Sequence, residues 1–139
     1  MIVVKDNNGN IHQVTDGTNT ITSGLTVRSV TETYISEDKL TWYTKYSDGW
    51  KECGGTTSQF NLSAGAGKTF TITLPLEFTN VTYSCQVTAS YQQNTNNAGG
   101  GPEVFNASKT TTTVLVGLWN RNGSTSCNNI AIEWMCCGY

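Results

Sequence analysis

Residues Tyr34–Gly55, YISEDKLTWYTKYSDGWKECGG, have the pattern of a β-hairpin rich in large aromatic side chains. Side chains along Leu40–Tyr46 alternate between two faces, as in a strand, so that Trp42 shares a face with Tyr46. Asp48–Gly49 predicts the turn, because glycine accepts a positive φ and aspartate tolerates one. The return strand then starts at Trp50 and ends at Gly54–Gly55. This hairpin is the strongest fold signal in the chain.

The segments that follow have the same two-residue period. Lys68–Leu74 and Tyr83–Tyr91 alternate between apolar and polar side chains, and Pro75 ends the first of them. Lys109–Trp119 reads as one long strand, and Ile130–Gly138 as the last strand. No segment has a helical period. Short, evenly spaced strands with turn signals predict an all-β fold, an antiparallel β-sandwich or a β-prism-like domain.

The hairpin tryptophans and the one near the C-terminus sit within apolar alternation, and we expect all three in the core: Trp42, Trp50 and Trp134. Truncating Trp50 to alanine would then cost about 3–5 kcal/mol.

The first quarter of the chain is different. Ile2–Val4 and Ile11–Val14 flank an Asn-Asn-Gly-Asn turn and predict a small hairpin, and Leu25–Val30 is a plausible short strand. We expect residues 1–33 to form a short N-terminal neck or the end of a shaft, and residues 34–139 to form the main β domain.

Three segments together resemble a known family. WYTKYSDGWKECGG, ITLPLEFTNVTYSCQVTASY and IEWMCCGY occur in this order between Tyr34 and Tyr139, and are similar to the C-terminal receptor-binding domain of phage tail-fibre proteins of the gp53-like type. The resemblance implies a protein of the virion tail fibre, which is made in the host cytoplasm and acts outside the cell. It implies a homotrimer that joins other tail proteins through its N-terminal side. Its implied partner is a bacterial surface glycan or protein receptor.

Composition limits the classes of molecule that the protein can bind. Charged residues make up 13% of the chain and the formal net charge is −2. No basic field exists to hold nucleic acid or an anionic membrane. No apolar run approaches the roughly 20 residues needed to span a bilayer. We therefore expect no nucleic-acid partner and no membrane insertion, and surfaces that bind through hydroxyl and amide groups.

Catalytic and metal-binding patterns are weak. His12 is the only histidine, and no nucleophile motif such as GxSxG accompanies it. Ser63–Lys68 lacks the spacing of a phosphate loop. We predict no catalytic residues, no metal, no cofactor and no enzymatic activity.

The five cysteines show no CxxC spacing. We expect buried free thiols, while a pairing of Cys85 with Cys127 or with Cys136 stays open. The adjacent Cys136 and Cys137 would point to opposite faces of a strand.

Two polar loops are the candidate receptor-binding segments, Gln92–Pro102 and Asn120–Asn129. They share an end of the domain if the strands that lead into them are parallel, and lie at opposite ends if those strands are antiparallel neighbours. We favour the second loop, because Trp119 adds a stacking surface and Arg121 a forked donor. An alternative is that Arg121 pairs with a carboxylate of the next subunit. The candidate contact residues are Trp119, Asn120, Arg121, Asn122, Asn128, Gln92, Asn94 and Asn96.

Two other function classes stay open: a carbohydrate-binding module or adhesin domain of a secreted bacterial protein, and a polysaccharide depolymerase. A stable monomer would favour the module, and a trimer the tail fibre.

Overall fold

The structure is a computed structural model, and it describes residues 2–5, 11–14, 28–92 and 101–139. Every regular element among these residues is a β-strand, and every pairing is antiparallel. The predicted all-β sandwich is therefore confirmed. The strands are β1 (Ile2–Lys5), β2 (Ile11–Val14), β3 (Val30–Ile35), β4 (Thr41–Tyr46), β5 (Lys51–Thr56), β6 (Phe60–Leu62), β7 (Gly67–Thr73), β8 (Ser84–Gln92), β9 (Glu103–Lys109), β10 (Thr113–Trp119) and β11 (Cys127–Gly138).

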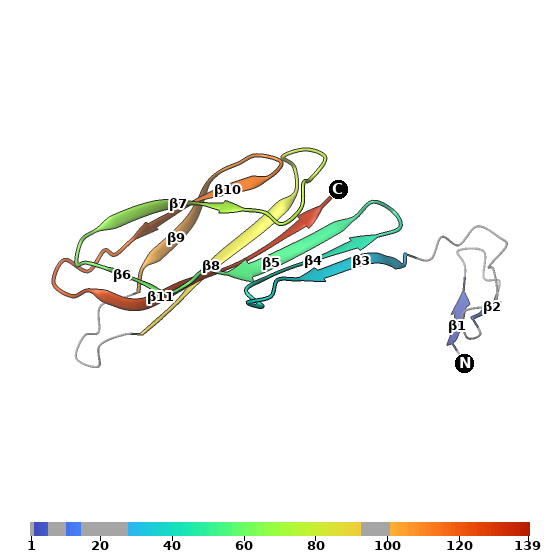
Figure 1. Ribbon diagram of the computed structural model, residues 1–139, viewed down its shortest axis with the longest axis horizontal. Helices are drawn as coiled ribbons and strands as arrows, with labels where there is room; N and C mark the ends of the chain where they lie inside the picture. The colour runs from blue at the N-terminus through green and yellow to red at the C-terminus, as the bar shows by residue number, and fades with distance from the viewer. Residues whose placement is uncertain (1, 6–10, 15–27, 93–100) are drawn as a thin grey trace.

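The last strand, β11, organises the larger sheet. One of its edges pairs with β8, and the other pairs first with β6 and then with β5. β4 and β3 extend this sheet beyond β5. A smaller sheet, in the order β7-β10-β9, packs over the β11 region, while β3 and β4 project past it (Figure 1). All six residues of β3 are exposed.

The aromatic hairpin forms as predicted, as β4 and β5. Gly49 has a φ of 86°, and its N–H donates to the carbonyl of Tyr46 at 3.0 Å. The hairpin also has a third strand that the sequence did not place there, because β3 pairs with β4 along its length. Arg28 and Ser29 lie outside it, so the strand expected over Leu25–Val30 begins only at Val30.

The N-terminal hairpin is present, with β1 paired to β2. Its predicted turn, Asn7–Asn10, and residues 25–27 lie outside the described residues. The expected domain boundary, between residues 33 and 34, falls within β3.

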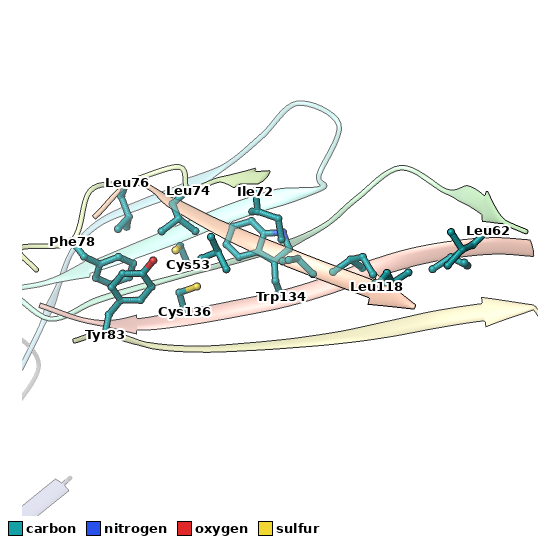
Figure 2. Close-up of a cluster of buried hydrophobic side chains, with 14 of the residues drawn as sticks. Cys53, Leu62, Ile72, Leu74, Leu76, Phe78, Tyr83, Leu118, Trp134 and Cys136 are labelled. Carbon is teal, nitrogen blue, oxygen red and sulfur yellow. The ribbon is translucent and has the colours of Figure 1, made fainter. Parts of the chain in front are cut away.

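The core lies between the two sheets (Figure 2). Ile130 and Ile132 of β11 and Val114 and Val116 of β10 are fully buried, because alternate side chains of facing strands interdigitate. At one end the ring of Phe78 stacks on that of Tyr83, with centroids 4.2 Å apart. The apolar faces predicted for Lys68–Leu74, Tyr83–Tyr91 and Ile130–Gly138 point inward, except at Tyr91, which is exposed.

Two of the three tryptophans expected in the core are elsewhere. Trp134 is 7% exposed and lies between the sheets. Trp42 shares a register row with Gly54 and Met135, whereas the neighbouring row holds the buried Cys53 and Cys136. Since neighbouring rows point to opposite faces, Trp42 lies on the side away from the core.

Trp50 lies on this same side. It is half-buried, packs edge-on against Tyr139, and donates its indole N–H to Glu52 at 3.1 Å. The expectation that Trp42 and Trp50 are core residues is therefore wrong. The reason is that both faces of the hairpin are aromatic, so the alternation alone does not say which face is covered.

The predicted strand Lys109–Trp119 is also wrong as one element. Lys109 ends β9, and β10 begins at Thr113. The hydroxyl of Thr110 accepts the N–H groups of Thr112 and Thr113 at 3.2 and 3.0 Å, which closes a tight turn. The threonine-rich start of the predicted strand is therefore a hairpin turn, and β9 is an element that the sequence interpretation missed.

Candidate functional site

One end of the sandwich gathers the segments that the sequence proposed for binding. Asn128, near the start of β11, pairs with Gln92 at the end of β8. Trp119, at the end of β10, pairs with Glu103 at the start of β9. The loops after β8 and after β10 therefore leave the same end, which we call the loop end (Figure 1). Of the two arrangements that the sequence left open, the structure has the shared end.

The chain enters the sandwich at the other end. Val30, the first residue of β3, pairs with Tyr46 beside the hairpin turn, and Gly138 at the end of β11 pairs with Lys51 beside the same turn. The entry of the chain and the loop end therefore lie at opposite ends of the larger sheet.

Trp119 is the most prominent aromatic side chain at the loop end. It is 49% exposed, although its strand β10 is the central one of the smaller sheet. The guanidinium of Arg121 lies over its ring, 5.3 Å from the centroid. The Nε of Arg121 is 2.7 Å from a carboxylate oxygen of Glu103. Arg121 thus has a carboxylate partner within its own chain, and it braces the indole from one side.

A shallow groove runs beside Trp119 on the outer side of the smaller sheet. Phe105 lies two register rows from Trp119 and therefore on the same face of the sheet. It is 50% exposed and covers Gly117 so closely that a Cβ there would lie 2.2 Å from its ring. The groove has a volume of about 330 Å³. We call it the aromatic groove; it is lined by Gly67, Lys68, Thr69, Phe105, Leu118 and Trp119. Sequence reasoning missed Phe105, because its segment was not assigned to a strand.

The loop after Trp119 is held by asparagine side chains. Asn120 is fully buried and donates its amide N–H groups to the carbonyls of Ser63 and Thr125, at 3.1 and 2.8 Å. Its side-chain oxygen accepts the backbone N–H of Asn122. The buried amide of Asn120 therefore positions the loop from below and presents no atom to a partner.

The other candidate residues are distributed as follows. The side-chain oxygen of Asn122 accepts the N–H groups of Ser124 and Thr125, and Asn128 is half-buried within β11. Gln92 ends β8. Asn94 and Asn96 lie outside the described residues. The receptor-binding role of all these positions stays a prediction.

Few charges face the groove. Arg121 pairs with Glu103. Lys68 stands in register with the buried Leu118, so its side chain leaves the sheet on the core side, where its ammonium lies 4.4 Å from the centroid of Phe60. The site therefore offers two aromatic surfaces, hydrogen-bonding groups and little net charge. Within the described ranges, no cluster of three His, Cys, Asp or Glu side chains is placed to hold a metal ion. No helix long and apolar enough to cross a membrane occurs in the same ranges.

Comparisons with known proteins place this fold. No protein-family model and no curated protein sequence matches the chain. Among solved structures, an N-truncated R1-type pyocin tail fibre matches 88% of this chain and 99% of its own, with a TM-score of 0.62 and 18% identity. The C-terminal part of the P. aeruginosa R1 pyocin fibre, residues 323–701, matches 78% of this chain with a TM-score of 0.59 and 18% identity. This chain spans 28% of the length of that second structure. The chain therefore has the fold of a pyocin tail-fibre C-terminal domain.

Proposed function

We propose that this chain is the receptor-binding tip of a phage or phage-like tail fibre, and that it attaches the particle to a glycan on a bacterial surface. The observation that carries the proposal is the fold shared with two pyocin fibres over 78% and 88% of the chain. One fold can serve many functions, so the proposal also depends on the position and chemistry of the loop end.

The placement of the loop end supports an attachment role. The chain enters the sandwich at the end opposite to Trp119 and Arg121. If the N-terminal side joins the rest of a fibre and other tail proteins, the loop end points away from the particle. Exposed loops on a rigid scaffold are common binding elements. The protein would then act in the virion, outside the cell, after synthesis in the host cytoplasm.

A homotrimer is part of the proposal, and the larger sheet offers a surface for it. On the side away from the core it carries an apolar face, which we call the outer face: Ile35, Trp42, Tyr46, Trp50, Met135 and Tyr139. Three of these side chains are at least 46% exposed, Ile35, Met135 and Tyr139. Glu52 lies among them and accepts hydrogen bonds from Tyr46 and Trp50. Exposed apolar side chains gathered on one face mark association sites, and a second copy of the chain is the occupant that we infer.

We infer a binding role and no catalysis. The carboxylate of Glu103, which stands in register with Trp119, is paired with Arg121. Stacking surfaces and compensated charges suit reversible recognition, which three tips on a fibre would strengthen by avidity.

The experiment is attachment of the fluorescently labelled protein to a panel of bacterial strains, together with its mass from light scattering. We expect a mass about three times that of the 15.1 kDa chain. Binding should be confined to some strains and abolished by mild periodate oxidation of the cells, whereas protease treatment should leave it intact. A stable monomer that binds purified polysaccharides would favour the secreted module instead. Release of reducing ends from the polysaccharide would favour the depolymerase.

The matched variant is the double change Trp119→Ala with Arg121→Ala. We expect it to lose attachment while it keeps its oligomeric mass. Full attachment by an intact trimer would remove the loop end from the proposal, and loss of the trimer would make the two residues structural.

A further inference from the structure

We propose that the aromatic groove stacks against the ring of an uncharged hexose, so that Phe105 and Trp119 recognise the apolar face of one sugar unit. This inference rests on the proposed attachment function and gives it a site and a ligand class. The site lies on the sheet surface and not within the polar loops themselves.

The exposure of the two rings is the first argument. Phe105 and Trp119 are 50% and 49% exposed, and they stand two register rows apart, on the same face of the sheet. Strands fix the two rings, and Arg121 braces one of them from the side. Rings held in this way lose little conformational freedom on binding, which favours affinity.

The shape of the groove is the second argument. Gly117 carries no side chain on this face, so the outer edge of the Phe105 ring lies over it, and Gly67 leaves the position opposite Trp119 empty. The resulting volume of about 330 Å³ is at the lower end of ligand pockets, which suits a small ring and not a bulky one. The hydroxyl-bearing side chain of Thr69 also lines the groove.

Charge decides between classes of sugar. Arg121 is paired with Glu103, and the side chain of Lys68 leaves the sheet on the side opposite to the groove, with its ammonium over Phe60. An acidic sugar would thus have to compete with Glu103 for its cation. A neutral hexose needs no counter-charge, and its hydroxyl groups can share the ion pair's remaining donors and acceptors.

The test uses methyl glycosides of neutral hexoses and of glucuronic acid as probes for the full chain. Binding is followed by NMR through the indole N–H signal of Trp119, which is assigned as the signal missing in Trp119→Phe. We expect a neutral glycoside to shift this signal more than those of the other tryptophans. Phe105→Ala should weaken its binding about tenfold, the effect of losing about 1.4 kcal/mol.

Two further variants sharpen the result. Gly117→Ala puts a methyl group where the Phe105 ring lies and should weaken binding while both rings are retained. Thr71→Ala, on the same sheet face beyond the groove, is the control and should bind normally. Equal affinity in Phe105→Ala and wild type, or tighter binding of the glucuronide, overturns the inference. Normal cell attachment by Phe105→Ala would also overturn it and would leave the attachment function standing, whereas failure of the wild-type protein to attach to any cell would remove the function itself.

A second inference comes from a separate observation, a row of three cysteines across neighbouring strands. Cys136 of β11 pairs in register with Cys53 of β5 on one side and with Cys85 of β8 on the other. The sulfurs of Cys136 and Cys85 are 2.6 Å apart. All five cysteines are free thiols, and Cys85 has Cys136 as its neighbour, not Cys127. Directly opposed residues of antiparallel strands lie about 4.5–5.5 Å apart at Cα, which fits a disulfide.

We infer that Cys85 and Cys136 form a disulfide when the protein meets a small-molecule disulfide such as oxidised glutathione. Cys85 is half-buried, whereas Cys53 and Cys136 are fully buried, so Cys85 is the point of entry. Its thiolate attacks oxidised glutathione, forms a mixed disulfide and releases one glutathione. Cys136 then attacks the Cys85 sulfur and releases the second glutathione, so that two thiol protons are lost and two electrons reach the oxidant.

The step should be slow. The hydrogen bond to Cys136, together with burial, raises the pKa of Cys85, and the hydrogen bond to Cys53 with burial raises that of Cys136 to about 12. Few thiolates therefore exist at neutral pH. Oxidation should take hours and should quicken as the pH rises.

Intact mass after unfolding and alkylation measures the result. After overnight incubation with oxidised glutathione we expect three alkylated cysteines, and proteolysis should yield one linked peptide pair that contains Cys85 and Cys136. Cys85→Ser should keep all four remaining thiols reduced, and Cys53→Ser should still form the bond. Five alkylated cysteines in the wild-type protein, or a Cys53–Cys136 pair, overturns the inference.

Discussion

The same substitution, phenylalanine to alanine, should mainly reduce stability at Phe78 and mainly reduce glycoside binding at Phe105. Phe78 is 1% exposed and stacks on Tyr83, so its loss removes a fully buried ring and leaves a cavity, at a cost of about 3–5 kcal/mol. Phe105 is 50% exposed and lies over Gly117, so about half of its transfer free energy is at stake, about 1 kcal/mol. For a chain of 139 residues, each kcal/mol corresponds to roughly 3–4 °C in thermal midpoint.

Thermal unfolding at one fixed protein concentration is the assay. We expect Phe78→Ala to lower the midpoint by roughly 10–20 °C and Phe105→Ala by less than about 5 °C. Binding of the neutral glycoside should show the reverse order, since the folded Phe78→Ala protein keeps its groove. Similar midpoints for the two variants would refute the placement of Phe78 in the core and of Phe105 on the surface.

Three shorter predictions concern the larger sheet. Trp50→Ala should cost about 1–3 kcal/mol, the sum of one edge-on aromatic contact and one hydrogen bond, and should reduce the trimer fraction in light scattering; a cost equal to that of Trp134→Ala would contradict it. Gly55→Ala should lower the thermal midpoint, because its Cβ would lie 2.5 Å from the carbonyl oxygen of Leu40; an unchanged midpoint would show that the strands can shift. The hydrogen bonds from Lys45 and Tyr43 lower the pKa of Glu32 below its ordinary 4.5, so its stabilisation is present above that pH and is lost as the pH falls through the lowered value. Glu32→Gln should therefore flatten the fall of stability in acid, and an unchanged acid slope would argue against this network.

The parts of the fold that the sequence predicted are those with a purely local cause. The turn at Asp48–Gly49 needs only a residue that accepts positive φ, and Gly49 has it. The period of two along Lys68–Leu74 and Ile130–Gly138 needs only a strand with one covered face. What failed depended on distant contacts. The outward position of Trp42 and Trp50 follows from which face of the larger sheet the smaller sheet covers, and no local pattern contains that information.

The candidate site was predicted in part for the same reason. Trp119 stands out locally, since it ends an apolar strand and precedes a polar loop, and it is exposed as expected. Asn120 has the same local setting and is buried, because its amide bonds to Ser63, a residue far away in the chain. The groove depends on Gly117 facing Phe105 across two strands, and that register is visible only once β9 is assigned.

The distribution of aromatic side chains argues for two separate binding surfaces. Among the described residues, three aromatics are buried, Phe78, Tyr83 and Trp134, while five are exposed, Tyr34, Tyr91, Phe105, Trp119 and Tyr139. Aromatic rings stabilise a protein most when they are buried. A monomer with fewer buried than exposed rings therefore leaves much apolar surface in water, and such surface marks sites where partners bind.

The exposed rings also divide by position. Tyr139 follows Gly138, which pairs beside the hairpin turn, and it packs against Trp50 on the outer face. Trp119 and Phe105 belong to the loop end of the other sheet. Because neither group shares a partner with the other, substitutions in the two groups should act additively. Outer-face variants should change assembly and spare glycoside affinity, and groove variants should do the reverse. A groove variant that dissociates the trimer would mean that the two surfaces are one.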